Sequence, residues 1–296
     1  MNKRLESLLE NTVLEPDKIY SSIENTDTVQ NIEIKLREKV ASKHYDDYLA
    51  AIANSHSVTV MDYEVERFLS KLPANALILD IGGCWGWHWR NLAEKHPNVS
   101  VVIMDFVRPN LVHAKNVLGD LVGKQVALMH ADATNLPFHL NEKFRGFDGV
   151  WTVQTFQHIP DFSKAVFEAH RVLIKGGYFA NYSLHKTPFN RFIYKCLGKK
   201  FHIKGEVAGS YYLERANNTQ RDIISNFFGE DNIEDRFTEC LFHPDLKLGF
   251  TGRVNSIFGI FDIWLSKIPV LGQVFARQRV FLAKKLNINY YNAASS

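Results

Sequence analysis

Short apolar runs alternate with amphipathic stretches through the middle of this chain. Five runs have the length and composition of buried strands. They cover residues 76–81, 99–104, 125–130, 148–153 and 177–183. Between them, apolar residues recur at helical spacing, which predicts helices near 86–96, 109–120 and 162–174. This alternation predicts an α/β fold, with a mostly parallel sheet covered by helices on both faces.

Two local signals refine the ends of the predicted helices. The segment Asp62–Leu72 places Val65, Phe68 and Leu69 on one face, which predicts a helix before the first strand, with Asp62 as its N-cap. The pair Gly176-Gly177 predicts a left-handed end to the helix of 162–174.

The flanking regions differ from this regular centre. Residues 1–70 are mixed and polar, and we expect a helical N-terminal extension or lid. Residues 71–296 form the predicted main domain, interrupted by a substrate-side insertion at about 185–275. Within and after that insertion the pattern predicts a helix over 218–228, a strand near 234–242 and a final strand over 277–285.

Four motifs follow the ends of the predicted strands. The run ALILDIGGCWG (76–86) is a buried strand, an acid and a glycine-rich turn, an arrangement that brings backbone N–H groups close to a bound nucleoside. About 20 residues later, the apolar run ending at Asp105 places a second acid where a ribose is held. The third and fourth motifs are HADATNLPF (130–138) and FDGVWTVQTFQHIP (147–160).

Together these motifs resemble the class I S-adenosylmethionine-dependent methyltransferases of the broad small-molecule type. The resemblance covers roughly 72–182, a typical domain size. It implies a Rossmann-like, seven-stranded sheet whose last strand is antiparallel, with S-adenosylmethionine as cofactor. The first motif of that family reads Asp-x-Gly-x-Gly-x-Gly, and Cys84 stands here at the middle glycine.

The resemblance also implies a set of cofactor-binding residues. It places Asp80 near the methionine end, Asp105 on the ribose, and Asp132 with Ala133 beside the adenine. The remaining residues of the set lie in the first turn, after the second strand and after the fourth strand: Gly82, Gly83, Cys84, Trp85, Gly86, Phe106, Gln154 and Thr155. Structural alternatives are a turn acid at Asp80 and an Asx-turn at Asp132.

Methyl transfer from an activated sulfonium requires an oriented acceptor, and we expect no metal. A base is useful only where the acceptor is a hydroxyl. His158 follows the fourth strand and His185 the fifth, and an imidazole accepts a proton near neutral pH. These two histidines are the candidate catalytic residues, and structural roles are the alternative for both.

Composition narrows the class of protein. A formal net charge of +3 over 296 residues does not indicate a nucleic-acid binder. The three cysteines Cys84, Cys196 and Cys240 have no metal-site or disulfide spacing, which suits a reducing compartment. With no signal-peptide pattern at the N-terminus, we expect a cytoplasmic protein.

Two segments of the insertion suggest partners. Residues 186–204 carry six Lys or Arg side chains and no acid, interleaved with aromatics. This mixture suits an anionic, phosphorylated or sugar- or lipid-linked acceptor, a membrane surface or single-stranded nucleic acid, or it is a solvated helix face. Residues 257–275 are strongly apolar and could cover the pocket, form a homodimer interface or touch lipid.

The sequence therefore favours methyl transfer to a hydroxyl of a small or carrier-bound acceptor. The alternatives are an RNA methyltransferase, an NAD-binding oxidoreductase and a non-catalytic protein that keeps the cofactor fold. Against the RNA enzyme stands Gln154-Thr155-Phe156, where a base-methylating motif would follow the fourth strand. Against the oxidoreductase, Gly82, Gly83 and Gly86 lack the regular dinucleotide-binding spacing.

Overall fold

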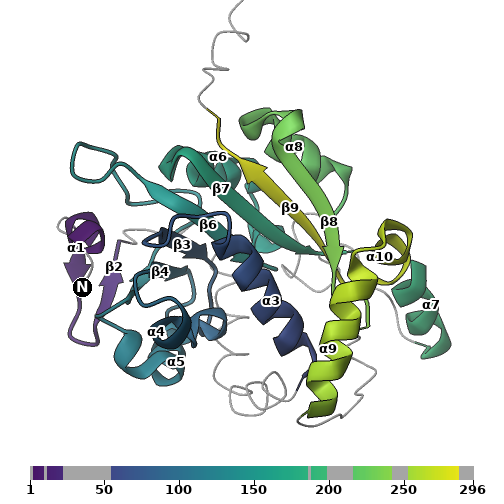
Figure 1. Cartoon of the computed structure of the whole chain (residues 1–296). Coiled ribbons are helices and arrows are strands. Elements are labelled where there is room, and N and C mark those ends of the chain that lie inside the picture. Colours follow the sequence, from purple (N-terminus) through teal and green to yellow (C-terminus); the bar gives the residue numbers. More distant parts are fainter. Residues whose placement is uncertain are drawn as a thin grey trace, which may run out of the picture.

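A computed structural model describes residues 3–9, 12–22, 55–185, 188–198, 216–241 and 253–286. Figure 1 shows a twisted sheet with helices packed on both faces. This confirms the predicted α/β class, a mostly parallel sheet with antiparallel strands at its ends. The α-helices are α1 (Lys3–Leu9), α3 (Ser57–Leu69), α4 (Leu92–Lys95), α5 (Arg108–Leu118), α6 (Phe162–Val172), α7 (Pro188–Cys196), α8 (Asn218–Phe228), α9 (Arg253–Ser266) and α10 (Pro269–Phe275).

Within the described residues the sheet has nine strands in the order β1-β2-β5-β4-β3-β6-β7-β9-β8. Their bounds are β1 (Val13–Leu14), β2 (Ile19–Ser21), β3 (Leu77–Ile81), β4 (Ser100–Asp105), β5 (Val126–His130), β6 (Phe147–Val153), β7 (Leu173–Leu184), β8 (Ile233–Thr238) and β9 (Gln278–Lys284). The expected number was seven. The two further strands, β1 and β2, come from the N-terminal region, where β2 pairs in parallel with β5.

The central strands are buried on both faces, which explains their nearly continuous apolar character. Side chains alternate between two cores. Leu77 and Leu79 of β3 belong to a core shared with α6 and α8, whereas Ile78 belongs to a core shared with α3 and α5. Strand β9 runs antiparallel between β7 and β8, as expected for the last strand.

Three local predictions are wrong. The helix before β3 begins at Ser57 with His56 as N-cap, and Asp62 lies inside it, paired with Arg90. The helix expected over 86–96 is a 3-10 helix, η1 (Trp87–Trp89), followed by the short α4. Gly176 does not cap α6, which ends at Val172. It lies within β7 at φ +81°, where the pairing of β7 with β6 skips from Leu173 to Tyr178.

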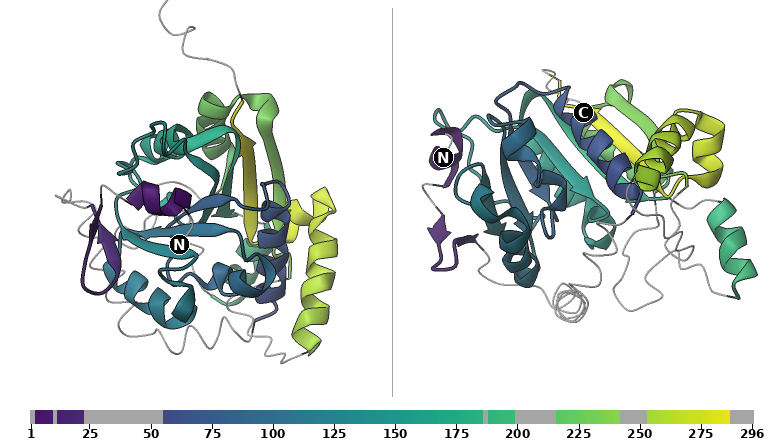
Figure 2. Two further views of the ribbon diagram at one scale, coloured as in Figure 1. Left: turned by 60° about the vertical axis from the view of Figure 1, so that its left-hand side comes forward. Right: turned by 60° about the horizontal axis from the view of Figure 1, so that its bottom comes forward.

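Predictions in the C-terminal part agree with the structure. Helix α8 has the predicted bounds, and β9 lies within the predicted final strand. Strand β8 overlaps the strand predicted near 234–242, but it begins at Ile233 and already ends at Thr238. Helices α7, α9 and α10 gather beyond α3 and β8, at the end of the sheet away from α1 and β1 (Figure 2). Four of the six basic residues of the stretch 186–204 lie outside the described residues: Lys186, Lys199, Lys200 and Lys204.

Candidate functional site

The carboxyl ends of β3, β4, β5 and β6 meet at one edge of the sheet, because these strands are parallel. Every predicted cofactor-binding residue lies at or just beyond this edge. In parallel α/β sheets, ligands bind in the crevice outside the carboxyl ends of the strands. The sheet therefore brings together residues that are separated by up to about 75 positions in the sequence (Asp80 to Thr155).

The turn after β3 has three residues in the left-handed region of backbone conformation. These are Gly82 at φ +71°, Cys84 at φ +50° and Gly86 at φ +66°. Glycine adopts such angles without steric cost, whereas a cysteine does so at roughly 1–2 kcal/mol. Cys84 thus occupies the conformation for which the family motif uses glycine.

The glycines of this turn are required by the packing of the protein itself. A Cβ atom on Gly82 would lie 2.2 Å from the side chain of Thr155, and one on Gly83 would lie 2.4 Å from the Asp80 carboxylate. The hydroxyl of Thr155 also donates to the Gly82 carbonyl over 3.3 Å. The loops after β3 and β6 are therefore in direct contact, so the space above Gly82 is filled by Thr155.

Asp80 is 1% exposed at the end of β3. Its carboxylate accepts a hydrogen bond from the indole N–H of Trp89, with 2.7 Å between Nε1 and Oδ2. Among the described residues it forms no ion pair with a Lys, Arg or His. Burial raises the pKa of Asp80 to about 7, with Asp105 adding a smaller increase and the Trp89 hydrogen bond opposing both. A cationic group bound beside it would favour its ionised form.

Asp105, 6% exposed, ends β4 and faces the glycine turn. One carboxylate oxygen accepts the backbone N–H of Cys84 over 3.0 Å, and the other accepts the backbone N–H of Val107 over 2.8 Å. These bonds fix the carboxylate at the sheet edge. The arrangement fits a ribose, whose neighbouring hydroxyls need a rigid acceptor.

The loop after β5 is held by a hydrogen bond to α6. Asp132 forms the Asx-turn considered from the sequence, accepting the N–H of Thr134 over 2.8 Å. The N–H of Leu136 donates to Glu168 of α6 over 2.8 Å, and Ala133 is buried beside it. Phe106 is half-buried, and its carbonyl lies 3.2 Å from the His130 ring, linking the loops after β4 and β5.

The tryptophans of the first turn pack within the protein. Trp85 is buried, and its ring meets the ring of His113 of α5 edge-on at 6.3 Å. Trp89 is fully buried and contacts Trp151 of β6 as well as Asp80. The hydrogen bond from Trp89 was not anticipated, because the sequence predicted a regular helix through this segment.

The loop after β6 turns sharply at Gln154, which has φ +54°. Its N–H donates to the Tyr182 carbonyl over 2.7 Å, and its side-chain oxygen accepts from the Arg277 guanidinium over 3.3 Å. Gln154 thereby connects the predicted cofactor side to the start of β9. This connection places Arg277 at the same edge of the sheet as the Gln154 turn.

Glu239 is a buried residue of this edge that the sequence analysis missed. It follows β8, is 1% exposed and has φ +60°. Its carboxylate accepts from Arg277 over 2.8 Å, from Gln278 over 2.7 Å and from the hydroxyl of Ser57. Burial opposes ionisation of Glu239, but the Arg277 charge and these hydrogen bonds hold its pKa below the ordinary value.

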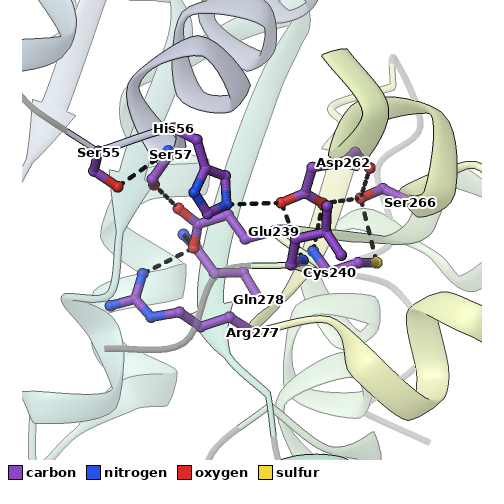
Figure 3. Close-up of polar contacts among 10 residues, drawn as sticks. Ser55, His56, Ser57, Glu239, Cys240, Asp262, Ser266, Arg277 and Gln278 are labelled. Carbon is purple, nitrogen blue, oxygen red and sulfur yellow. Dashed lines mark hydrogen bonds and ion pairs between the residues drawn. The ribbon is translucent and has the colours of Figure 1, made fainter. Parts of the chain in front are cut away.

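Figure 3 shows a second buried carboxylate next to Glu239. Asp262 of α9 accepts the backbone N–H of Cys240 over 2.6 Å and that of Leu241 over 3.1 Å. It also accepts from the Ser266 hydroxyl over 3.3 Å, and the His56 ring lies close, with 3.5 Å between Nε2 and Oδ2. These contacts join α9 to the ends of α3 and β8. An acid inside a predicted strand and an acid inside a strongly apolar segment were the available sequence signals.

The two candidate bases differ in position. His158 ends the 3-10 helix η3 (Phe156–His158) beside the Gln154 turn and is half-buried. His185 follows β7, and its ring lies 5.0 Å from that of Phe237. Burial lowers the pKa of His185. His158 is therefore the candidate beside the predicted cofactor loop, whereas His185 is held within the protein.

These features fit S-adenosylmethionine. Asp80 provides a buried carboxylate for a cationic amino-acid tail, and Asp105 provides a fixed acceptor for ribose hydroxyls. The loop after β5 would border the adenine. At Gly82 the glycine turn meets Thr155 of the same protein, so a cofactor would approach the turn beside Gly82 rather than over it.

Comparisons with known proteins agree with this geometry. Residues 79–181 match the model of a methyltransferase domain. The chain is 34% identical over 120 residues to a malonyl-[acyl-carrier protein] O-methyltransferase of Geobacter sulfurreducens, covering 39% of this chain and 43% of that protein. It is 34% identical over 113 residues to a demethylmenaquinone methyltransferase of Thermus thermophilus, covering 38% and 48%. The chain thus matches less than half the length of each of these curated relatives.

A solved structure extends the likeness of fold beyond the matched domain. A Haloferax volcanii methyltransferase, determined with a methyltransferase activator, superposes with a TM-score of 0.52 at 12% identity. The superposition covers 89% of this chain and 100% of the other. At this identity it shows the fold alone. Residues 79–181 therefore form a methyltransferase domain, and the ordered motifs at its sheet edge are similar to those of the class I S-adenosylmethionine-dependent methyltransferases.

Proposed function

We propose that this chain transfers the methyl group of S-adenosylmethionine to an oxygen atom of a small or carrier-bound anionic acceptor. Binding of S-adenosylmethionine is supported above all by one observation: two buried carboxylates, Asp80 and Asp105, lie on either side of the glycine turn. The match of residues 79–181 to a methyltransferase domain agrees with it. The nature of the acceptor is inferred from the position of His158 and from the basic residues near this edge of the sheet.

When bound, the cofactor supplies a methyl group activated on a sulfonium. The protein's part is to bind, to orient and to exclude water. Asp80 would hold the ammonium of the methionine tail, and Asp105 would accept the ribose hydroxyls. Thr155 and Gln154 would close the crevice above the glycine turn, since Thr155 already contacts Gly82.

Proton removal is required if the acceptor is a hydroxyl. His158 lies on the loop directly after Gln154-Thr155, at the carboxyl end of β6. It would accept the hydroxyl proton on its ring nitrogen as the oxygen is methylated. The names of the two curated relatives specify different acceptors, so the choice of oxygen rests on His158 rather than on them.

An anionic acceptor is supported by the basic residues beside this edge. Arg191 and Lys195 are exposed on α7, which follows β7 in the sequence. Arg277 lies within reach of Gln154. No Asp or Glu occurs between 186 and 204, so the positive charge of this stretch is not compensated locally. Phosphate or carboxylate groups bind such clusters through charge-assisted hydrogen bonds.

The test is transfer of a labelled methyl group to acceptors of defined chemistry. The panel pairs hydroxyl compounds with and without phosphate, and carrier-linked with free acids. We expect label in an anionic oxygen acceptor, lost in His158→Ala where that acceptor is a hydroxyl. Transfer to neutral and anionic acceptors at equal rates would contradict the anionic part. Label found on nitrogen or carbon would contradict the oxygen part.

A further inference from the structure

Helix α9 has one face buried and the opposite face apolar and exposed. On the buried face, a Cβ atom on Gly259 would lie 2.5 Å from Thr59, so α9 packs closely on α3. Asp262 on the same side is fully buried in the network with Cys240. These contacts fix α9 to the domain and determine which of its residues face outward.

The outward face is unusually apolar. Ile257 is 65% exposed, Ile260 is 63% exposed and Trp264 is 56% exposed. Phe261 is 49% exposed, and its ring stacks on Trp264 at 5.8 Å. These positions follow helical spacing along one stripe, so the exposure is continuous rather than scattered. The exposure of this stripe leaves a homodimer interface and lipid contact as the sequence alternatives to compare.

Two neighbouring helices extend this surface. Phe192 of α7 is 63% exposed and Val270 of α10 is 69% exposed. Helix α10 contacts both α9 and α7, and Phe189 of α7 lies 4.9 Å from Phe275 of α10, measured between ring centroids. Figures 1 and 2 show the three helices together at one end of the sheet. We call the outward faces of α7, α9 and α10 the helical patch.

The charged side chains around the helical patch indicate whether a lipid bilayer or a second copy of the chain would bind there. Arg191 and Lys195 of α7 and Lys267 after α9 are exposed. The one acid within residues 188–198 and 253–275 is Asp262, which is fully buried. Exposed aromatic and aliphatic side chains with cations and no exposed acid match an anionic bilayer surface. A second copy of the patch would bring its cations against like charges.

The geometry of the helices indicates a position on a bilayer rather than across it. No single helix in the described parts of the chain is long and apolar enough to span a membrane. The segments Val254–Ser266 and Pro269–Phe275 reach that length and composition only as a pair, and the pair is bent by 114°. Since α9 is also packed on α3, its exposed stripe can enter only the headgroup region.

We propose that the helical patch docks the protein on the surface of an anionic lipid bilayer. Docking would set α9 in the membrane plane, with Ile257, Ile260 and Trp264 among the lipid headgroups and Lys195 and Lys267 on lipid phosphates. On its opposite, buried face α9 is joined through Asp262 to Cys240, the residue after Glu239, so docking would hold this edge of the sheet near the bilayer. A lipid-linked acceptor would reach that edge from the bilayer.

The experiment is co-sedimentation of the full chain with vesicles. Vesicles of phosphatidylcholine with one-third phosphatidylglycerol are compared with phosphatidylcholine alone. We expect binding to the anionic vesicles that weakens as salt rises. The double variant Ile257→Ser, Trp264→Ser should bind at least about tenfold more weakly. The matched control is Val112→Ser on α5, which removes an apolar side chain that is 44% exposed on another face.

Charge and fluorescence give independent readouts. Lys195→Glu should weaken binding to anionic vesicles by about fivefold or more, since one such charge near the surface is worth about that factor. Lys164→Glu, exposed on α6, should not. Trp264 is the most exposed of the five tryptophans, so vesicles should shift the emission to the blue, and Trp264→Phe should abolish the shift while retaining binding.

Equal binding of the wild type and the double variant would overturn the inference. So would a dimer in solution that the double variant dissociates, without vesicle binding, since the patch would then be an interface between copies. Binding of S-adenosylhomocysteine is measured on the same samples. A wild-type protein that binds S-adenosylhomocysteine but not anionic vesicles refutes the docking alone, and a wild-type protein that binds the vesicles but not S-adenosylhomocysteine refutes the proposed cofactor site alone.

Discussion

Replacing Asp80 by asparagine separates the effect of this buried carboxylate on the stability of the protein from its effect on cofactor binding. Burial raises the pKa of Asp80 from 3.8 to about 7, so the folded protein prefers the protonated form. The associated stability is present below the unfolded pKa, near 4, and is lost as pH rises toward 7. A difference of about three pKa units corresponds to about 4 kcal/mol, an upper limit for the cost of ionised Asp80 above pH 7.

Asparagine has nearly the same shape, carries no charge and can still accept the Trp89 N–H. Asp80→Asn should therefore raise the melting temperature at pH 8, and its advantage should shrink toward pH 4. The same variant should bind S-adenosylmethionine about 10- to 100-fold more weakly, because the ammonium loses its anionic partner. Greater stability with weaker binding is the expected signature of a functional buried charge.

The assays are thermal unfolding from pH 4 to pH 8 and calorimetric titration with S-adenosylmethionine. Asp120→Asn is the control, because that carboxylate is 98% exposed and has no burial cost. Wild-type binding near pH 7 should also release protons, since the ligand favours ionised Asp80, and the variant should release fewer. A stability difference that does not change with pH would refute the assigned pKa. Unchanged affinity would show that the methionine tail is held elsewhere.

Three further predictions concern the other edge residues. Asp105→Ala should weaken binding of S-adenosylhomocysteine by about 1–3 kcal/mol without preventing folding, and an unchanged dissociation constant would refute ribose binding there. With a hydroxyl acceptor, His158→Ala should lower turnover about 10²- to 10⁴-fold at unchanged cofactor affinity, whereas His185→Ala should chiefly reduce stability; the reverse result would reassign the base. Glu239→Gln should destabilise the fold by about 3–5 kcal/mol at pH 7, because Arg277 loses its charged partner. That difference should fall as pH drops from the ordinary carboxyl value of 4.5 through the lowered pKa of Glu239, and identical melting curves would contradict it.

The pattern of apolar residues predicted the strands that are buried on both faces and the helices with clear ends. The strands β3, β4 and β5 are apolar on both faces, so their positions were recoverable from composition alone. Helix α8 has a clear N-cap in Asn217, whose side chain accepts the Gln220 N–H, and its bounds agree with the prediction. The edge positions of Asp80 and Asp105 followed directly from the ends of these strands.

Contacts between distant segments were not recoverable in this way. Thr155 and Gly82 are 73 residues apart, so the sequence could not show that one fills the space above the other. Glu239 and Arg277 are separated by 38 residues, and only the pairing of β8 with β9 brings them together. The start of α3 at Ser57, five residues before the predicted cap, coincides with a contact from Ser57 to Glu239.

The central claim is that the edge formed by β3, β4 and β6 binds S-adenosylmethionine. Calorimetric titration of the full chain with S-adenosylhomocysteine, set against NAD under the same conditions, tests it most directly. We predict one site per chain for S-adenosylhomocysteine, no heat with NAD, and weaker binding in Asp105→Ala but not in Asp120→Asn. Absence of heat and of thermal stabilisation at millimolar S-adenosylhomocysteine, or preferential binding of NAD, would contradict the claim.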